Sequence, residues 1–228
     1  MQDSLANVLA SVYAETKRRF TTWSTSAEYR PFTNPPATAG DVGFAILYTP
    51  ARYRPNLLIV GQNPSDFSDN GDPGAEPNGE MLSGSIPTRN SYLLDDHRFA
   101  KQLRKLFVGH RDLLASAVGM NVWYFQCTSG ANGAPEPLRD YCAEATRTIV
   151  AAIGPRAVLC FGRPAFDALR GSDSGTIISG TKARRLSQRE TEIWYVQHPT
   201  GARPPSVPAH DTPIVLTEIE AYLGRSSA

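Results

Sequence analysis

Two hydrophobic patterns recur along the chain, and together they predict helices that alternate with buried strands. Helical spacing of apolar residues, with start and stop signals, predicts helices at 4–20, 95–107, 135–153, 164–171 and 213–223. Short continuous apolar runs, typical of strands buried on both faces, predict strands at 56–60, 118–125, 157–161 and 193–197, and a shorter strand is expected at 43–48. This alternation predicts the α/β class with a mostly parallel sheet.

Polar loops follow three of the predicted strands. They read Gln62-Asn-Pro-Ser-Asp after the first strand, Gln126-Cys-Thr-Ser-Gly after the second, and His198-Pro-Thr-Gly-Ala-Arg after the last. Ligands of open α/β sheets bind outside the carboxyl ends of the strands, so we expect these loops to converge on a site. Each loop taken alone is also consistent with an ordinary polar turn.

Composition is that of an ordinary globular protein, with 228 residues, 41% of them hydrophobic and 20% charged. We find no internal repeat and no dividing linker, so one domain is expected over residues 1–228, with residues 1–50 forming an N-terminal helix and loop that pack on it. No apolar run approaches the roughly 18 residues that span a membrane, and no signal-peptide pattern begins the chain. A cytoplasmic protein without membrane contact is therefore the expectation.

Three scattered cysteines, Cys127, Cys142 and Cys160, form no Cys-x-x-Cys pair. A disulfide framework and a structural zinc or iron–sulfur site are therefore not expected, and no cofactor is predicted. The formal net charge of +1 permits a nucleic-acid partner without favouring one. Basic residues gather late in the chain, at Lys182, Arg184, Arg185, Arg189 and Arg203, where a phosphate-contacting surface or a solvated charged loop is expected.

Three stretches in this order resemble motifs of the uracil-DNA glycosylase superfamily. Gly61-Gln-Asn-Pro resembles its first motif, and His198-Pro-Thr-Gly resembles its second. Leu159-Cys-Phe-Gly-Arg-Pro-Ala-Phe-Asp-Ala-Leu resembles the strand–glycine–helix segment between them, and the resemblance covers about residues 55–224. It implies a three-layer fold in which helices flank a four-stranded, mostly parallel sheet. It also implies a base-excision enzyme that hydrolyses the N-glycosidic bond of uracil or a related damaged base in DNA. We expect a monomer that binds DNA.

The resemblance assigns catalytic roles to two residues. Such an enzyme takes the base out of the stack, and negative charge grows on the base as the bond breaks. The resemblance makes His198 the donor to a base oxygen and Asn63 the residue that holds the attacking water. A neutral amide at Asn63 only orients the water, so a slow enzyme is expected. In this respect the chain is similar to the mismatch-specific and single-strand-selective branches.

Substrate and DNA contacts are implied for further residues. Gly61, Gln62 and Thr200 are expected at the base, with Phe67, or next Tyr92, stacking on it. The amide that reads the base edge is expected near Phe125, and Gln126, Asn121 or Asn132 are the candidates. Residues expected to press into the DNA are Gly201, Ala202 and Arg203; Ala202 is a small wedge, and Arg203 can contact phosphate instead.

Other interpretations of these residues stay open. Asn63 can stabilise a turn and His198 can bond backbone, in which case neither acts on a substrate. At the level of the whole protein, the alternatives are a binding module of the same fold that holds DNA or a base without cleaving it, and a hydrolase of small nucleosides.

Overall fold

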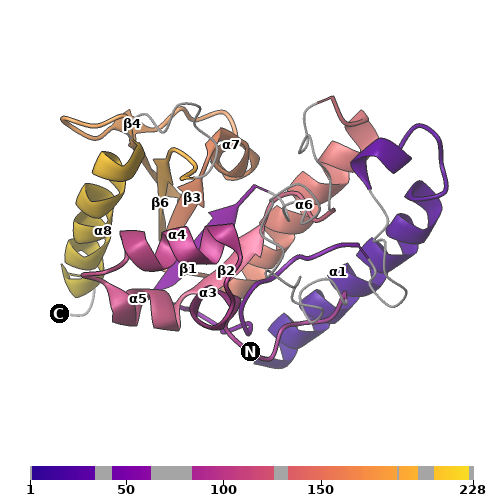
Figure 1. Ribbon diagram of the computed structural model, residues 1–228, viewed down its shortest axis with the longest axis horizontal. Coiled ribbons are helices and arrows are strands. Elements are labelled where there is room, and N and C mark those ends of the chain that lie inside the picture. The colour runs from indigo at the N-terminus through magenta and orange to yellow at the C-terminus, as the bar shows by residue number, and fades with distance from the viewer. Residues whose placement is uncertain are drawn as a thin grey trace.

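A six-stranded mixed sheet lies at the centre of the fold, in the strand order β2-β1-β3-β6-β5-β4, with helices around it (Figure 1). The computed structural model describes residues 2–33, 43–62, 84–125, 133–188, 190–199 and 208–225. The strands are β1 (Leu57–Gly61), β2 (Val118–Asn121), β3 (Ala157–Phe161), β4 (Thr176–Ile177), β5 (Arg184–Gln188) and β6 (Thr191–Val196). The predicted α/β class is confirmed.

The four expected core strands pair in parallel, but the expectation of a four-stranded sheet is wrong. β1 pairs with β2 and β3, and β3 pairs with β6, all in parallel. β5 and β4 then extend the same sheet in antiparallel fashion beyond β6. Residues 176–196 thus form antiparallel pairs of strands, and β4 and β5 are the two strands that make the sheet mixed.

Helices cover both faces of the sheet. They are α1 (Gln2–Trp23), η1 (Arg30–Phe32), α3 (Ser91–Leu94), α4 (Arg98–Leu106), α5 (Arg111–Ser116), α6 (Glu136–Ile153), α7 (Arg163–Arg170) and α8 (Pro208–Arg225). Leu58 and Val60 of β1 pack in the core with α1, α6 and α7, whereas Leu57 and Ile59 pack with α4, α5 and α8. This alternation follows from the two-residue period of a strand, and it explains why an unbroken aliphatic run is buried on both sides.

Several boundaries differ from those expected. The strand expected at 118–125 ends at Asn121, and residues 43–48 form only two isolated bridges, through Phe44 and Leu47. The helix expected at 95–107 is preceded by α3, because the side chains of Asn90 and His97 each cap a new helix start. α5 was not expected. α8 begins at Pro208, so that Pro213 lies inside the helix.

Among the described helices, none is long and apolar enough to cross a membrane. α6 ends as expected, since Gly154 takes a left-handed conformation (φ 60°) and its N–H bonds the Val150 carbonyl.

Candidate functional site

The carboxyl ends of four neighbouring strands meet beside His198. Gly61 is the last residue of β1 and pairs with Asn121, the last residue of β2. Gly162 follows β3 with φ 93°, and a Cβ placed on it would lie 3.4 Å from the Cβ of His198. This backbone conformation suits glycine, and the missing side chain allows the chain after β6 to approach the chain after β3. The end of β3 thus lies beside His198, and the end of β1 lies beside Asn121.

Phe99 of α4 joins these strand ends to one another. Its ring stacks on the imidazole of His198, with ring centroids 5.2 Å apart and an interplanar angle of 15°. Its Cε1 lies 3.9 Å from the position that a Cβ on Gly61 would take. Phe161 and Tyr92 contact the Phe99 ring edge-on, at 5.6 and 5.9 Å. Helical periodicity assigned Phe99 only to an apolar helix face, so its place beside His198 was missed.

Asn121 is the amide that lies at this edge of the sheet. It is only 2% exposed, and its Nδ2 donates a hydrogen bond of 2.8 Å to the phenol oxygen of Tyr48. Burial raises the pKa of Tyr48, so the phenol stays neutral. The Oδ1 of Asn121 lies 3.0 Å from the position of a Cβ on Gly61, which places the amide oxygen directly beside the end of β1.

Tyr92, the second candidate for stacking on a base, lies in the core. It is fully buried, it stacks on Tyr48 at 5.7 Å, and it covers Gly119 of β2 so closely that a Cβ there would lie 2.3 Å from its ring. Burial raises the pKa of its phenol. Phe99 is the half-buried aromatic residue that contacts His198, and Tyr92 supports it from behind.

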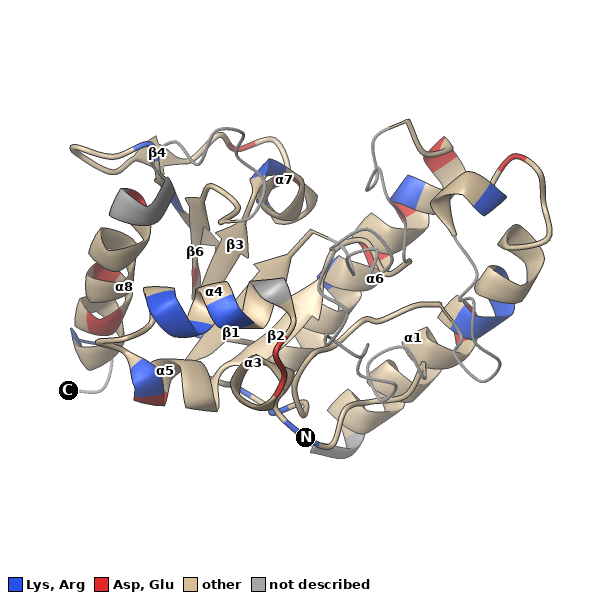
Figure 2. Cartoon of the chain, in the orientation of Figure 1, with Lys and Arg blue, Asp and Glu red and all other residues tan. Residues whose placement is uncertain are grey.

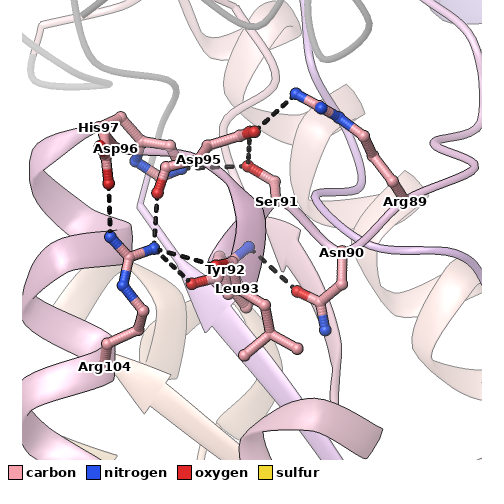
Figure 3. A network of polar contacts seen from close by, with 9 residues as sticks. All are labelled: Arg89, Asn90, Ser91, Tyr92, Leu93, Asp95, Asp96, His97 and Arg104. Atoms are coloured by element: carbon pink, nitrogen blue, oxygen red, sulfur yellow. Dashed lines mark hydrogen bonds and ion pairs between the residues drawn. The ribbon is translucent and has the colours of Figure 1, made fainter.

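A polar network holds the start of α4, and therefore Phe99, in place (Figure 3). The Nδ1 of His97 accepts a hydrogen bond from the Ala100 N–H, so the ring proton is on Nε2, which lies 3.1 Å from the Ser91 hydroxyl. Ser91 in turn donates to Asp95, whose carboxylate also pairs with Arg89 at 2.7 Å. Burial lowers the pKa of His97 to about 4, so the ring is neutral at pH 7.

Arg104 closes this network from within α4. Its guanidinium donates to the carbonyl oxygens of Asp95 and Tyr92, at 2.6 and 3.1 Å, and pairs with the Asp96 carboxylate at 2.8 Å (Figure 3). These bonds satisfy carbonyl oxygens at the end of α3. They also attach residues 95–97, which connect α3 to α4, to the side of α4. The orientation of Phe99 is thus determined by side-chain hydrogen bonds as well as by packing.

Gly61, Gln62 and His198 are the expected site residues that the structure describes. Gln62 is half-buried, and its carbonyl accepts a hydrogen bond of 2.8 Å from the Trp123 N–H. The remaining expected residues lie outside the described residues, and they are Asn63, Phe67, Gln126, Thr200, Gly201, Ala202 and Arg203. Asn132 lies outside them as well. In the part of the chain that the structure describes, no group of three or more His, Cys, Asp or Glu side chains is arranged to hold a metal ion.

Comparison with known proteins leaves the site to be interpreted from its own geometry. No protein-family model matches the chain, and no curated protein matches it. The resemblance to the glycosylase superfamily therefore rests on the motifs, and the function that follows from it is a proposal.

Proposed function

We propose that this protein is a DNA glycosylase that hydrolyses the N-glycosidic bond of uracil or a related damaged base. One observation carries the proposal: His198, the Asn121 amide and the Phe99 ring gather around Gly61 at the carboxyl ends of adjacent parallel strands. The same strand ends bear the two glycosylase-like motifs, Gly61-Gln-Asn-Pro and His198-Pro-Thr-Gly. A single position thus combines a ring donor, an amide and an aromatic face.

His198 is the group that stabilises the departing base. Negative charge develops on a base oxygen as the glycosidic bond breaks, and an imidazole N–H aimed at that oxygen lowers the barrier. Stacking on Phe99 fixes the plane of the imidazole, so little reorganisation is needed when the charge appears. Loss of one such donor reduces the rate by about 10²- to 10³-fold in enzymes that stabilise an oxyanion.

Asn121 is the residue that reads the edge of the base. The Nδ2 of Asn121 is used within the protein, since it donates to the Tyr48 phenol at 2.8 Å and to the Ala45 carbonyl at 3.5 Å. Its Oδ1 is therefore the atom proposed to accept a hydrogen bond from an N–H on the edge of a pyrimidine. Its Nδ2 is anchored by Tyr48, so the amide has one orientation, with Oδ1 beside Gly61. Asn63, two residues after Gly61, is the residue proposed to hold the attacking water. Because its amide is neutral, we expect slow turnover.

A cleavage assay tests the proposal. Purified protein is incubated with single- and double-stranded oligonucleotides that carry uracil, hypoxanthine or a mismatched base, and alkali then reveals abasic sites. We expect product from the wild-type protein and a loss of about 10²- to 10³-fold in rate for His198→Ala and Asn63→Ala. Asn56→Ala is a matched control. Asn56 is exposed and directly precedes β1, at the end of the strand away from the site, and its side chain accepts a hydrogen bond from Arg156.

Each outcome of the assay has a clear meaning. Product that depends on both Asn63 and His198 supports a glycosylase and identifies its substrate. Wild-type protein that is folded by circular dichroism but gives no product with any lesion contradicts the proposal. In that case the binding module becomes the better interpretation, and affinity for the same oligonucleotides is the next measurement.

A further inference from the structure

A basic groove lies between α7 and the paired strands β5 and β6, on the face of the sheet that α7 covers. Its volume is about 320 Å³, and its charged lining consists of Arg163, Asp167, Arg170, Lys182 and Arg184. α7 supplies the first three of these residues, Lys182 lies two residues before β5, and Arg184 begins β5. Figure 2 shows basic residues on α7 and on the adjoining β4–β5 segment. We call this hollow the basic groove.

Cations outnumber carboxylates in the basic groove. Among the residues described there, four cationic side chains face one carboxylate, that of Asp167. Asp167 is shared, since it bonds Arg163 at 3.2 Å and Arg170 at 2.5 Å. Arg163 is 78% exposed despite this contact. The groove therefore keeps an excess of positive charge that is open to solvent, which suits an anionic ligand.

Tyr195 of β6 forms the aromatic part of the basic groove. It is half-buried and packs against Phe166 with ring centroids 5.4 Å apart. Burial raises the pKa of the Tyr195 phenol, and the nearby charges of Arg163 and Arg184 oppose that rise. Both guanidinium groups therefore act on the phenol oxygen, which remains protonated at neutral pH. An aromatic ring bordered by arginines is a combination that binds nucleic-acid strands.

The strand register decides which basic residues reach the groove. Arg184 pairs with Tyr195 across β5 and β6, whereas Arg185 pairs with Trp194. Side chains of neighbouring strand residues point to opposite faces, so Arg185 lies on the α8 side. There its guanidinium bonds Glu192 at 2.8 Å and lies over the Trp194 ring. The basic stretch seen in the sequence is thus divided, and only part of it faces the groove.

The basic groove and the His198 site are continuous along the chain at two points. Arg163 directly follows Gly162, where a Cβ would lie 3.4 Å from the His198 Cβ, and Tyr195 precedes His198 by three residues. From this continuity we propose that the basic groove holds backbone phosphates of the DNA strand beside the nucleotide whose base is bound at His198. The inference rests on the proposed function. Because the cations come from two separate elements, they suit an extended polyanion better than a single phosphate.

Binding of undamaged single-stranded DNA tests this inference without any need for cleavage. Affinity for a labelled oligonucleotide is measured at several salt concentrations between about 50 and 200 mM. The test protein carries Arg163→Gln, Lys182→Gln and Arg184→Gln. We expect its affinity at low salt to fall by at least about tenfold. The salt slope is the steepness with which the logarithm of affinity falls as the logarithm of salt concentration rises. It is expected to decrease by about 0.7 for each phosphate that the removed cations no longer neutralise.

The control replaces two exposed arginines at the opposite edge of the sheet. Arg52 precedes β1 and Arg111 begins α5, which leads into β2, so Arg52→Gln with Arg111→Gln changes net charge without changing the groove. This control is expected to keep the wild-type affinity, apart from a small general effect of net charge. Arg163→Gln alone is a second test variant that does not endanger folding, since that side chain is largely exposed.

The results separate this inference from the proposed function. Equal affinity and equal salt slope in the groove variants and the control overturn the inference, even if the protein cleaves uracil-containing DNA. A second result also overturns the inference. If inorganic phosphate or a mononucleotide competes as strongly per phosphate as the oligonucleotide does, the groove is a site for single phosphates and not for a DNA strand. If DNA binding depends on the groove residues but no base is released from any lesion, the glycosylase proposal is contradicted and the inference about the groove is not.

Discussion

Two neighbouring regions at the carboxyl edge of the sheet differ in the chemistry of their side chains. The His198 site is built from an imidazole, the Phe99 ring, glycine backbone and a buried amide. The basic groove is built from arginine and lysine side chains around Tyr195, and Arg163 is largely exposed to water. The two regions adjoin along the chain, because a Cβ on Gly162 would lie 3.4 Å from the His198 Cβ and Gly162 is followed by Arg163.

This difference predicts that, in the proposed glycosylase, affinity for DNA and rate of cleavage have separate origins. Hydrogen bonds in the sheltered His198 site act at low local dielectric, where each donor has a large effect on a developing charge. Charges in the open groove act through water and are screened by salt, so under the proposal they contribute affinity for a phosphate backbone and little selectivity for a base. Changes near His198 are therefore expected to alter the rate, and changes in the groove to alter affinity and its salt dependence.

Apart from the residues proposed to be catalytic, the largest effect is expected from His97, which lies before Phe99 at the start of α4. Its protonation is expected to lower the free energy of unfolding at acid pH. The pKa of His97 is about 4 in the folded protein and 6.5 for an unperturbed histidine, so between these values the unfolded chain binds the proton and the folded chain does not. The stabilisation is complete above about pH 6.5 and is lost as the pH falls toward 4. From pH 7 to 4.5 the free energy of unfolding is expected to fall by about 2 kcal/mol from this group.

Chemical denaturation at pH 7 and at pH 4.5 measures this loss, with His97→Asn as the matched variant. Asparagine keeps an acceptor at the start of α4 but does not titrate, so its loss over the same pH range is expected to be smaller. The cations of the groove keep their charge throughout this range. An identical pH dependence in the two proteins would show that the network around Ser91 and Asp95 is not sensitive to His97.

Sequence patterns predicted the parallel part of the sheet well because burial on both faces requires continuous apolar runs. Leu57 to Val60 has no polar position, and such a run fits few environments other than a central strand. β4 and β5 lack this signal. Thr176 and Ile177 are exposed, and Leu186 is the one apolar residue of β5, whose sequence is Arg-Arg-Leu-Ser-Gln. Antiparallel pairing of β5 with β6, and of β4 with β5, makes these segments strands.

The candidate site was predicted less completely, because its residues depend on contacts between distant segments. Motifs and strand ends located Gly61 and His198. Helical periodicity gives the apolar face of α4 but not the element that this face meets, so the stacking of Phe99 on His198 had no sequence signal. The sequence did not show that the strand ends at Asn121, because the apolar run continues to Phe125. Trp123, Tyr124 and Phe125 are buried core residues that follow the last paired residue of β2.

A smaller effect is expected from removing the ring that orients His198. Phe99→Leu keeps an apolar side chain but removes the stacking interaction, and aromatic pairs of this kind contribute about 0.5 to 1.5 kcal/mol. Cleavage is therefore expected to slow by up to about tenfold, while the salt slope of DNA binding stays at the wild-type value. Phe32→Leu is the matched control, because Phe32 is also half-buried but packs with the α1 and α6 core. A changed salt slope in Phe99→Leu would mean that the two regions are not separate.

The smallest effect, and the sharpest test of the boundary of the His198 site, is expected from one methyl group. A Cβ on Gly61 would lie 3.0 Å from the Asn121 Oδ1, so Gly61→Ala must move the amide by a few tenths of an ångström. Tyr48 holds the other end of that amide, so the shift turns the group that is proposed to read the base. We expect cleavage to slow a few-fold with a stability change below about 1 kcal/mol. Gly109→Ala, where a Cβ meets open space, is the control. Unchanged selectivity among uracil, hypoxanthine and mismatched bases in Gly61→Ala would argue that Asn121 anchors Tyr48 and does not read the base.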